Sequence, residues 1–288
     1  MRAATLLPAL AIVAACGDDG GGGVDASDVA RTLATCTTTI ASDAPAFYQR
    51  YFRCVTVTKT ATGVSIATED LPPHPSYYWG AASPSYTPFD TSRGAGYAPN
   101  PNTLAAQDLT ITIPDAPVAA GVTITPDLVD AEAGTNAAEY AGGPIGVALD
   151  SVALFSGMAA PGMDIAEERF TFDNHEGHPE MRGAYHYHRP TPGPLEVLVA
   201  TGAVTTSVPG SAELELYGIL CDGTVVLGCV ELDGTATSGL DAQGGHLGDL
   251  RAADGTTYFT ARYHTHVCAD ARGHGYTPEI HYYAACAR

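Results

Sequence analysis

Short runs of alternating apolar and polar residues recur along this chain. Residues 54–60, 109–114 and 122–125 alternate in this way and are rich in β-branched side chains. Because successive side chains of a strand point to opposite faces, this pattern predicts half-buried strands. Residues 143–150 and 152–155 are apolar almost throughout, and a short run of this kind predicts a strand that is buried on both faces.

Segments with helical character are few and short. Residues 24–35 are predicted to form one helix and residues 164–170 another. Residues 70–97 are interrupted by proline and tyrosine, which predicts a long loop that packs against another part of the chain or carries function. The 32 glycines and 20 prolines favour turns over long helices. The predicted fold is therefore mostly β, a single domain with few short helices.

The second half of the chain repeats three sequence elements of the first half in the same order. The matched pairs are residues 146–151 with 218–223, residues 173–178 with 241–246, and residues 185–188 with 263–266. The second pair shares the pattern Asp-x-x-x-Gly-His, and the third is Tyr-His-Tyr-His against Tyr-His-Thr-His. These matches predict an internally duplicated β unit, with halves at about residues 143–192 and 214–268.

Each repeat contains three histidines in positions that suit metal binding. In a strand, the two histidines of a Tyr-His-x-His motif share one face and the tyrosines occupy the other. Two imidazoles on a rigid strand, with a third from the Gly-His element, match the ligand sets of zinc and copper sites. Asp173 and Asp241 are predicted to accept hydrogen bonds from the imidazole N–H groups and so to fix the ring tautomers. The predicted metal ligands are His178, His186, His188, His246, His264 and His266.

Several features of the predicted site stay open. The two sets of histidines are compatible with two separate sites or with one shared two-copper centre between the halves. His74 lies in a proline-framed turn and is a candidate extra ligand. The alternative is that the histidines bridge strands by hydrogen bonds inside a polar core and bind no metal.

The first 30 residues have the pattern of an export signal followed by a tether. An arginine precedes an apolar run over residues 3–15, which is too short to span a bilayer. The run ends in Val-Ala-Ala-Cys, which resembles a bacterial lipobox, and this resemblance implies lipidation at Cys16. We predict a lipoprotein signal peptide at residues 1–15 and a flexible Gly- and Asp-rich tether at residues 16–30. The β domain then occupies residues 31–288.

Export determines the expected location, partners and cofactor. The lipid on Cys16 implies membrane anchoring at the periplasmic face or the cell surface, with the outer membrane as the expected location. An ordinary cleaved secretory signal is the alternative, and it also predicts export. In an oxidising compartment copper is slightly favoured over zinc as the bound metal. The net charge of −19 disfavours nucleic acid as a partner.

The remaining cysteines indicate disulfides. The chain has 7 cysteines, so six remain beside Cys16, and an even number in an oxidising compartment favours pairing. Cys36 with Cys54 is the predicted pair, because both flank the first strand region. The other pairings stay open.

The repeat and its flanking motifs resemble the bacterial YHYH-domain family, which is named for the motif at residues 185–188. Four further elements occur in the family's order: Asp-Leu-Pro-Pro-His-Pro at 70–75, Asn-Pro-Asn at 100–102, Gly-Val-Ala-Leu-Asp-Ser at 146–151 and Gly-His-Pro at 177–179. The resemblance extends over residues 70–281 and implies no particular reaction. It also implies that a family disulfide is missing, since His175 and residues 191–194 occupy the places of its cysteines.

Three functions are consistent with these patterns. The favoured one is a lipid-anchored envelope protein that binds a transition metal through its duplicated histidines. A second is a metal-dependent enzyme, oxidase-like with copper or hydrolase-like with zinc, with a pocket covered by the loop from Tyr77 to Tyr86. A third is a metal-free surface interaction domain in which the histidines and tyrosines are structural. The sequence has no Gly-x-Ser-x-Gly elbow and no Walker loop, so no motif decides whether the chain is an enzyme.

Overall fold

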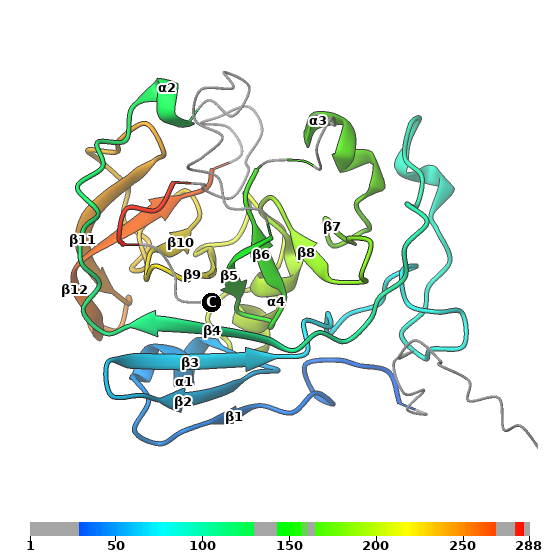
Figure 1. Ribbon diagram of the computed structural model, residues 1–288, viewed down its shortest axis with the longest axis horizontal. Coiled ribbons are helices and arrows are strands. Elements are labelled where there is room, and N and C mark those ends of the chain that lie inside the picture. Colours follow the sequence, from blue (N-terminus) through cyan, green and yellow to red (C-terminus); the bar gives the residue numbers. More distant parts are fainter. Residues whose placement is uncertain (1–28, 130–142, 158, 160–164, 269–279, 285–288) are drawn as a thin grey trace, which may run out of the picture.

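A computed structural model of the chain describes residues 29–129, 143–157, 159, 165–268 and 280–284 (Figure 1). The predicted signal peptide, Cys16 and the tether up to residue 28 lie outside the described residues. Within the described ranges, no helix combines the length and the apolar character that crossing a membrane requires.

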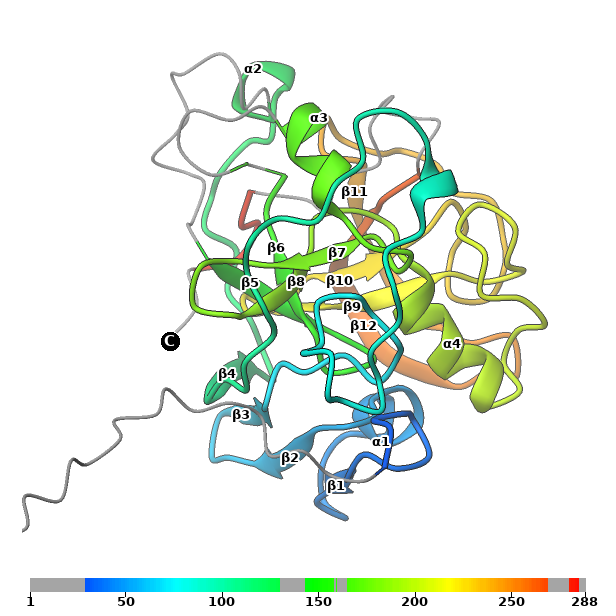
Figure 2. The same ribbon diagram turned by 90° about the vertical axis from the view of Figure 1, so that its right-hand side faces the viewer.

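A four-stranded sheet forms one end of the molecule (Figure 2). β2, β3 and β4 pair antiparallel, whereas β1 runs parallel to β2. The alternation along β4 buries Ile111 and Ile113 on one face, which confirms the strand predicted at residues 109–114. In spatial order the strands are β1 (Thr39–Ile40), β2 (Thr56–Lys59), β3 (Gly63–Thr68) and β4 (Leu109–Pro114).

An eight-stranded sheet carries the repeated elements, in the order β11-β12-β10-β9-β5-β6-β8-β7 (Figure 1). The strands are β5 (Pro144–Ala148), β6 (Ala153–Phe155), β7 (Gly177–Pro179), β8 (Tyr185–Tyr187), β9 (Leu216–Leu220), β10 (Val225–Leu227), β11 (Gly245–Arg251) and β12 (Thr257–His266). From β5 outward, β6 is antiparallel to β5, β8 parallel to β6 and β7 antiparallel to β8. From β9 outward, β10, β12 and β11 pair in the same way. The two halves therefore share one pattern of strand pairing, while their origin by duplication stays a prediction.

The two halves meet where β5 pairs antiparallel with β9, with Val147 opposite Ile219. A Cβ atom at Gly146 would lie 2.6 Å from the carbonyl oxygen of Ile219, and one at Gly218 would lie 2.3 Å from that of Val147. Both distances are shorter than a van der Waals contact, and the atoms approached belong to the backbone. The close approach of these two strands therefore requires glycine on each side.

The helices are short and lie outside the sheets. They are α1 (Ala46–Tyr51), α2 (Pro126–Val129), α3 (Ile165–Glu168) and α4 (Pro192–Ala200), with 3-10 turns η1 (Thr91–Arg93) and η3 (Arg169–Thr171). α1 connects the two sheets, because the ring of Phe47 lies 5.0 Å from that of Phe259 on β12. α4 follows the first Tyr-His-Tyr-His motif and packs against β9. The predicted mostly β fold with few short helices is confirmed.

Two predicted elements are wrong. The described part of the helix predicted at residues 24–35 contains turns, and Arg31 is bonded to the Ser85 hydroxyl and the Leu71 carbonyl. Residues 122–125 form no strand, although Ile124 packs in a small apolar cluster. In both segments contacts with distant parts of the chain override the local propensity.

Disulfides join neighbouring segments in both sheets. Cys36 is bonded to Cys54, which confirms the predicted pair. Cys229 is bonded to Cys268, and this bond joins the segment after β10 to the segment after β12. The pairing agrees with the even number of cysteines that remain beside Cys16.

Candidate metal centres

The first histidine cluster consists of His178, His186 and His188. His178 on β7 lies directly opposite His186 on β8, and His188 follows two residues later on the same face of the strand. The ring centroids are 4.6 Å apart for His178 and His186, 4.7 Å for His186 and His188, and 5.6 Å for His178 and His188. No residue of the cluster is more than 3% exposed. The three rings therefore converge on one buried point.

Hydrogen bonds to Nδ1 fix the tautomer of the two histidines from the Tyr-His-Tyr-His motif. His186 Nδ1 lies 3.0 Å from the carbonyl oxygen of Ala184. His188 Nδ1 lies 2.5 Å from the carbonyl oxygen of Ser156. Because a carbonyl oxygen only accepts hydrogen bonds, both Nδ1 atoms carry the proton, and both Nε2 atoms keep a lone pair.

His178 has the same tautomer, which is fixed by the side chain of Thr171. Its Nδ1 lies 2.6 Å from the Thr171 hydroxyl, which donates its own proton to the Glu168 carbonyl 2.8 Å away. The Asn100 amide nitrogen also lies 3.5 Å from His178 Nδ1, but the Thr171 hydroxyl is much closer at 2.6 Å, so its oxygen accepts from Nδ1. The Asn100 amide supports this strand as well, because it donates to the Pro179 carbonyl at 3.0 Å.

Three nitrogen lone pairs consequently face one another in the first cluster. The Nε2 atoms of His178 and His186 are 3.0 Å apart, and Nε2 of His188 is buried with no hydrogen-bond partner among the described residues. Burial lowers the pKa of His178 and His186 well below the ordinary value, and that of His188 to about 4. At neutral pH protons therefore do not fill the gap. Facing lone pairs repel unless a cation lies between them, and imidazole nitrogen is a ligand for transition metals.

Aromatic side chains enclose the first cluster. The ring of Phe155 stacks on His186 at 3.8 Å, and the ring of Phe172 lies 4.8 Å from that of His178. A carboxylate also lies nearby, since Glu168 Oε1 is 3.8 Å from His178 Nε2. The cluster is thus walled by apolar rings and has an acidic group at its edge.

The second histidine cluster consists of His246, His264 and His266 together with Glu231. His246 on β11 lies opposite His264 on β12. Glu231 Oε1 is 3.0 Å from His246 Nε2 and 3.5 Å from His266 Nε2, and its Oε2 is 3.0 Å from His264 Nε2. In each of the two clusters the potential ligand atoms lie within 4.8 Å of one another, so both could hold a metal ion.

Hydrogen bonds from Nδ1 to backbone carbonyls recur in the second cluster. His264 Nδ1 donates to the Arg262 carbonyl at 2.9 Å, and His266 Nδ1 donates to the Gly228 carbonyl at 2.8 Å. His264 Nε2 faces Glu231 Oε2 at hydrogen-bond distance, 3.0 Å, so a proton or a metal ion lies between these two atoms. Burial lowers the pKa of His266 to about 4. Burial alone would raise the pKa of Glu231, but the hydrogen bond with His264 and the neighbouring histidines lower it on balance. An anionic carboxylate among these ring nitrogens is stabilised by a cation between them, either a proton on a ring nitrogen or a metal ion.

The disulfide Cys229–Cys268 braces the second cluster. Cys229 precedes Glu231 by two residues, and Cys268 follows the last histidine of the cluster by two. The bond therefore joins the segment that carries the carboxylate to the strand that carries two of the imidazoles. The matched positions in the first half are Gly157 and Pro190, so the first cluster has no such brace.

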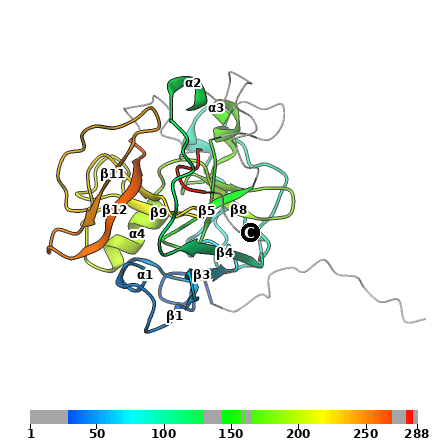
Figure 3. The ribbon, with the colours of Figure 1, turned by 60° about the vertical axis from the view of Figure 1, so that its left-hand side comes forward.

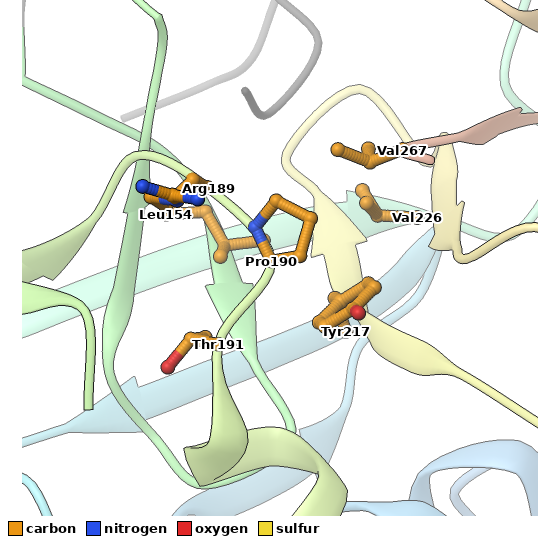
Figure 4. A pocket seen from close by; sticks show the side chains of 7 residues that line it. All are labelled: Leu154, Arg189, Pro190, Thr191, Tyr217, Val226 and Val267. Carbon is orange, nitrogen blue, oxygen red and sulfur yellow. The ribbon is translucent and has the colours of Figure 1, made fainter. Parts of the chain in front are cut away.

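The two clusters are separate sites. β8 and β12 are five strand spacings apart, with β6, β5, β9 and β10 between them, which amounts to about 24 Å at the usual spacing of about 4.8 Å. Figure 3 shows β12 and β8 on opposite sides of the β5–β9 pair. A hollow between the halves is lined largely by apolar side chains, among them Leu154, Pro190 and Val226 (Figure 4). This geometry excludes a two-copper centre shared by the two clusters.

The aspartates predicted to orient the imidazoles bind tyrosines instead. The Tyr185 hydroxyl lies 2.8 Å from both carboxylate oxygens of Asp173, and the Tyr263 hydroxyl donates to Asp241 Oδ2 at 2.8 Å. Since tyrosine and histidine alternate along each strand, these aspartates lie on the face opposite to the clusters. Backbone carbonyls and Thr171 accept from the imidazoles in their place. The role predicted for Asp173 and Asp241 is therefore wrong.

His74 also lies behind the first cluster. Its Nε2 is 3.0 Å from the Tyr187 hydroxyl, and its ring stacks on that of His175 at 3.6 Å. Tyr187 in turn donates to Asp150 at 2.9 Å, and His175 Nε2 lies 3.0 Å from Glu196 Oε1. His74 thus belongs to a buried polar network, and its prediction as an extra ligand is wrong.

The sequence patterns did not identify the carboxylate of the second cluster. Glu231 is one of 32 acidic residues, and its spacing differs between the halves: it precedes Asp241 by ten positions, whereas Glu168 precedes Asp173 by five. The Asn-Pro-Asn element at residues 100–102 could have been linked to the first cluster from the sequence. Asn100 and Asn102 both donate to the Pro179 carbonyl, next to His178 on β7.

Comparison with known proteins gives one match. Residues 121–245 match the family model described as YHYH protein. This range includes the whole first cluster and Glu231, and it ends one residue before His246. No curated protein and no solved structure matches the chain.

Proposed function

The chain is a YHYH-domain protein, and we propose that it is a metal-binding protein of the cell envelope, with one transition-metal ion in each histidine cluster. The observation that carries the proposal is the convergence of imidazole lone pairs in the first cluster. The Nε2 atoms of His178 and His186 lie 3.0 Å apart, and the Nδ1 hydrogen bonds leave neither of them a proton to share.

The spacing of these atoms suits a metal ion after a small outward movement of the rings. Metal–imidazole bonds of about 2.0–2.1 Å place two nitrogens of a tetrahedral site about 3.3 Å apart. The distance between His178 and His186 is 3.0 Å, so the rings need to separate by only a few tenths of an ångström. Their Nδ1 atoms already donate to oxygen acceptors, which is the arrangement usual for histidine ligands.

Copper is the metal that we favour over zinc. Imidazole nitrogen is a ligand for copper as well as for zinc, and copper is the metal that we expect in an oxidising compartment. We further propose that the chain is exported and anchored to a membrane by a lipid on Cys16, with the outer membrane as its location. The disulfides Cys36–Cys54 and Cys229–Cys268 support an oxidising compartment.

A metal-dependent enzyme is the second candidate, and the exposure of the second cluster favours it. The side chains of His246 and Glu231 are 20% and 19% exposed, so solvent reaches this site, as a catalytic zinc or copper requires. The tests are hydrolysis of activated esters by the zinc-loaded protein and oxidation of phenols by the copper-loaded protein. Either activity, if it is lost in Glu231→Gln, would establish this candidate.

Elemental analysis of the protein purified from the envelope without a histidine tag tests the proposal. We expect one ion per cluster, the loss of one ion in His186→Ala, and the loss of the other in His264→Ala. His175→Gln is the matched control, because His175 lies close to the first cluster but pairs with Glu196. Protein that contains no metal, takes up none after reloading, and keeps its thermal midpoint in strong chelators would instead support the metal-free interaction domain.

A further inference from the structure

The two clusters differ in their access to water, although backbone carbonyls hold two rings of each cluster in the same way. The first cluster is at most 3% exposed and lies between Phe155 and Phe172. The matched positions in the second half are Leu227 and Leu240, and Leu240 is 39% exposed. The first site is therefore closed by aromatic rings, whereas the second is open on one side.

The clusters also differ in the position of their carboxylate. Glu231 lies within 3.5 Å of all three imidazoles of the second cluster, so it can coordinate the same ion. Glu168 approaches the first cluster at His178, with 3.8 Å between Glu168 Oε1 and His178 Nε2. It therefore does not face all three rings as Glu231 does, and three neutral nitrogens supply the ligands of the first site.

Charge and burial together determine which ion each site stabilises. The cost of transferring an ion into a low-dielectric interior rises with the square of its charge, so a divalent ion costs about four times as much as a monovalent one. In the first cluster no carboxylate faces all three imidazoles, so a monovalent ion leaves the smaller net charge inside the apolar wall. A divalent ion there would leave a larger one. In the second cluster a divalent ion gains a direct carboxylate ligand and contact with water.

We infer that the first cluster is a site for Cu⁺ and that the second is a site for a divalent ion, for which Zn²⁺ is the probe. This inference rests on the proposed function, that both clusters bind metal. Three imidazoles without a coordinating carboxylate suit the softer, singly charged ion, and the set with a carboxylate suits the harder, doubly charged one. The protein would then hold two different metals at once, about 24 Å apart at the usual strand spacing.

Anaerobic titrations of the stripped full-length protein test this inference. Cu⁺ is added in competition with bicinchoninate, and Zn²⁺ in competition with a fluorescent zinc chelator. In His186→Gln we expect the loss of tight Cu⁺ binding with Zn²⁺ binding retained. In Glu231→Gln we expect Zn²⁺ affinity to fall about 100-fold with Cu⁺ binding retained. Glu196→Gln is the control, since Glu196 is acidic but pairs with His175.

A measurement on the unaltered protein serves if a variant does not fold. One equivalent each of Cu⁺ and Zn²⁺ should both be retained after gel filtration, and a second equivalent of Zn²⁺ should be lost. Retention of two equivalents of Zn²⁺ with no preference for Cu⁺ would overturn this inference and leave the proposed function standing. Retention of neither metal would overturn both.

Discussion

The two halves of the large sheet have the same backbone frame but different surroundings. In both, the cross-strand histidine pair is followed by a third histidine whose Nδ1 bonds a carbonyl of the loop after the parallel neighbour strand, Ser156 in one half and Gly228 in the other. On the opposite face of β8 and of β12, the side-chain contacts of the two halves differ. Tyr187 in the first half bonds Asp150, whereas the matched Thr265 bonds the backbone of Gln243.

This difference separates two properties of a metal site. The direction of four of the six imidazoles depends on backbone carbonyls and strand register, which side-chain substitutions elsewhere leave unchanged, while the Thr171 hydroxyl orients His178. The charge and the access to water depend on individual side chains: Glu231 on one side, Phe155 and Phe172 on the other. A repeated frame can therefore keep two sites of equal geometry while their preferences for ions diverge.

The largest expected effect tests whether the two halves depend equally on the pairing of β5 with β9, which we call the seam. In Gly218→Ala the new Cβ would lie 2.3 Å from the carbonyl oxygen of Val147, and we expect the free energy of unfolding to fall by about 3 kcal/mol. Gly146→Ala, with a distance of 2.6 Å to the Ile219 oxygen, should cost a similar amount. Urea denaturation measures both losses.

Gly80→Ala is the control for the seam, because a Cβ atom there meets nothing within 4 Å. If Gly146→Ala proved neutral while Gly218→Ala unfolded the protein, the seam would not be equivalent on its two sides. The symmetric description of the sheet would then fail.

The next largest effect is the loss of folding stability at low pH. Burial gives His188 a pKa of about 4 in the folded protein, against about 6.5 in the unfolded chain. Below pH 6.5 the unfolded chain therefore binds more protons at this position, so the contribution of His188 to the free energy of unfolding falls as the pH falls from about 6.5 to about 4 and is constant above that window. This histidine alone should contribute a loss of about 3 kcal/mol.

Urea denaturation of chelator-treated protein across this pH window measures the loss. In His188→Gln the slope of stability against pH should be clearly smaller than in the unaltered protein. His266→Gln is the matched variant in the second half, and because burial lowers the pKa of His266 to about 4 as well, this variant should reduce the slope by a similar amount. An unchanged slope in His188→Gln would show that this ring is not buried in its neutral form.

A smaller effect is expected from the brace of the second cluster. In Cys229→Ser with Cys268→Ser the segment that carries Glu231 is no longer tied to the end of β12, so the ligands must be ordered when the metal binds. We expect the Zn²⁺ affinity of the second cluster to fall about tenfold, through the entropy of ordering them, and that of the first cluster to stay the same. Cys36→Ser with Cys54→Ser is the control in competition titrations.

The sequence could predict those features that depend on the alternation of side chains. It predicted the strand at residues 109–114, the buried strand around Val147 and the convergence of the histidines within each half, because strand geometry determines which side chains share a face. It did not predict the acceptors at Nδ1. Any residue has a backbone carbonyl, so nothing in the residue types distinguishes the Ala184 and Ser156 carbonyls from others.

The remaining errors have a common physical cause. Asp173 was chosen from its matched position in the repeat, but whether it lies on the histidine face or on the tyrosine face depends on how the loop before β7 folds back. Ile124 belongs to an alternating segment that is buried but has no strand beside it. Glu231 reaches its cluster from a segment whose spacing differs between the halves. Each outcome depends on contacts between distant segments, which local patterns do not encode.

The smallest effect compares β8 and β12 on the face opposite to the histidine clusters. Tyr187→Phe removes the hydroxyl that Asp150 and His74 share, and we expect the free energy of unfolding to fall by about 1–2 kcal/mol, because buried polar atoms lose a partner. Thr265→Val removes one hydrogen bond to the Gln243 carbonyl and should cost about 1 kcal/mol. Thermal and urea denaturation measure both, and metal titration of the same variants should show unchanged binding. If Tyr187→Phe instead weakened Cu⁺ binding as strongly as His186→Gln, the ring geometry would depend on the network behind the strand, and backbone carbonyls alone would not determine it.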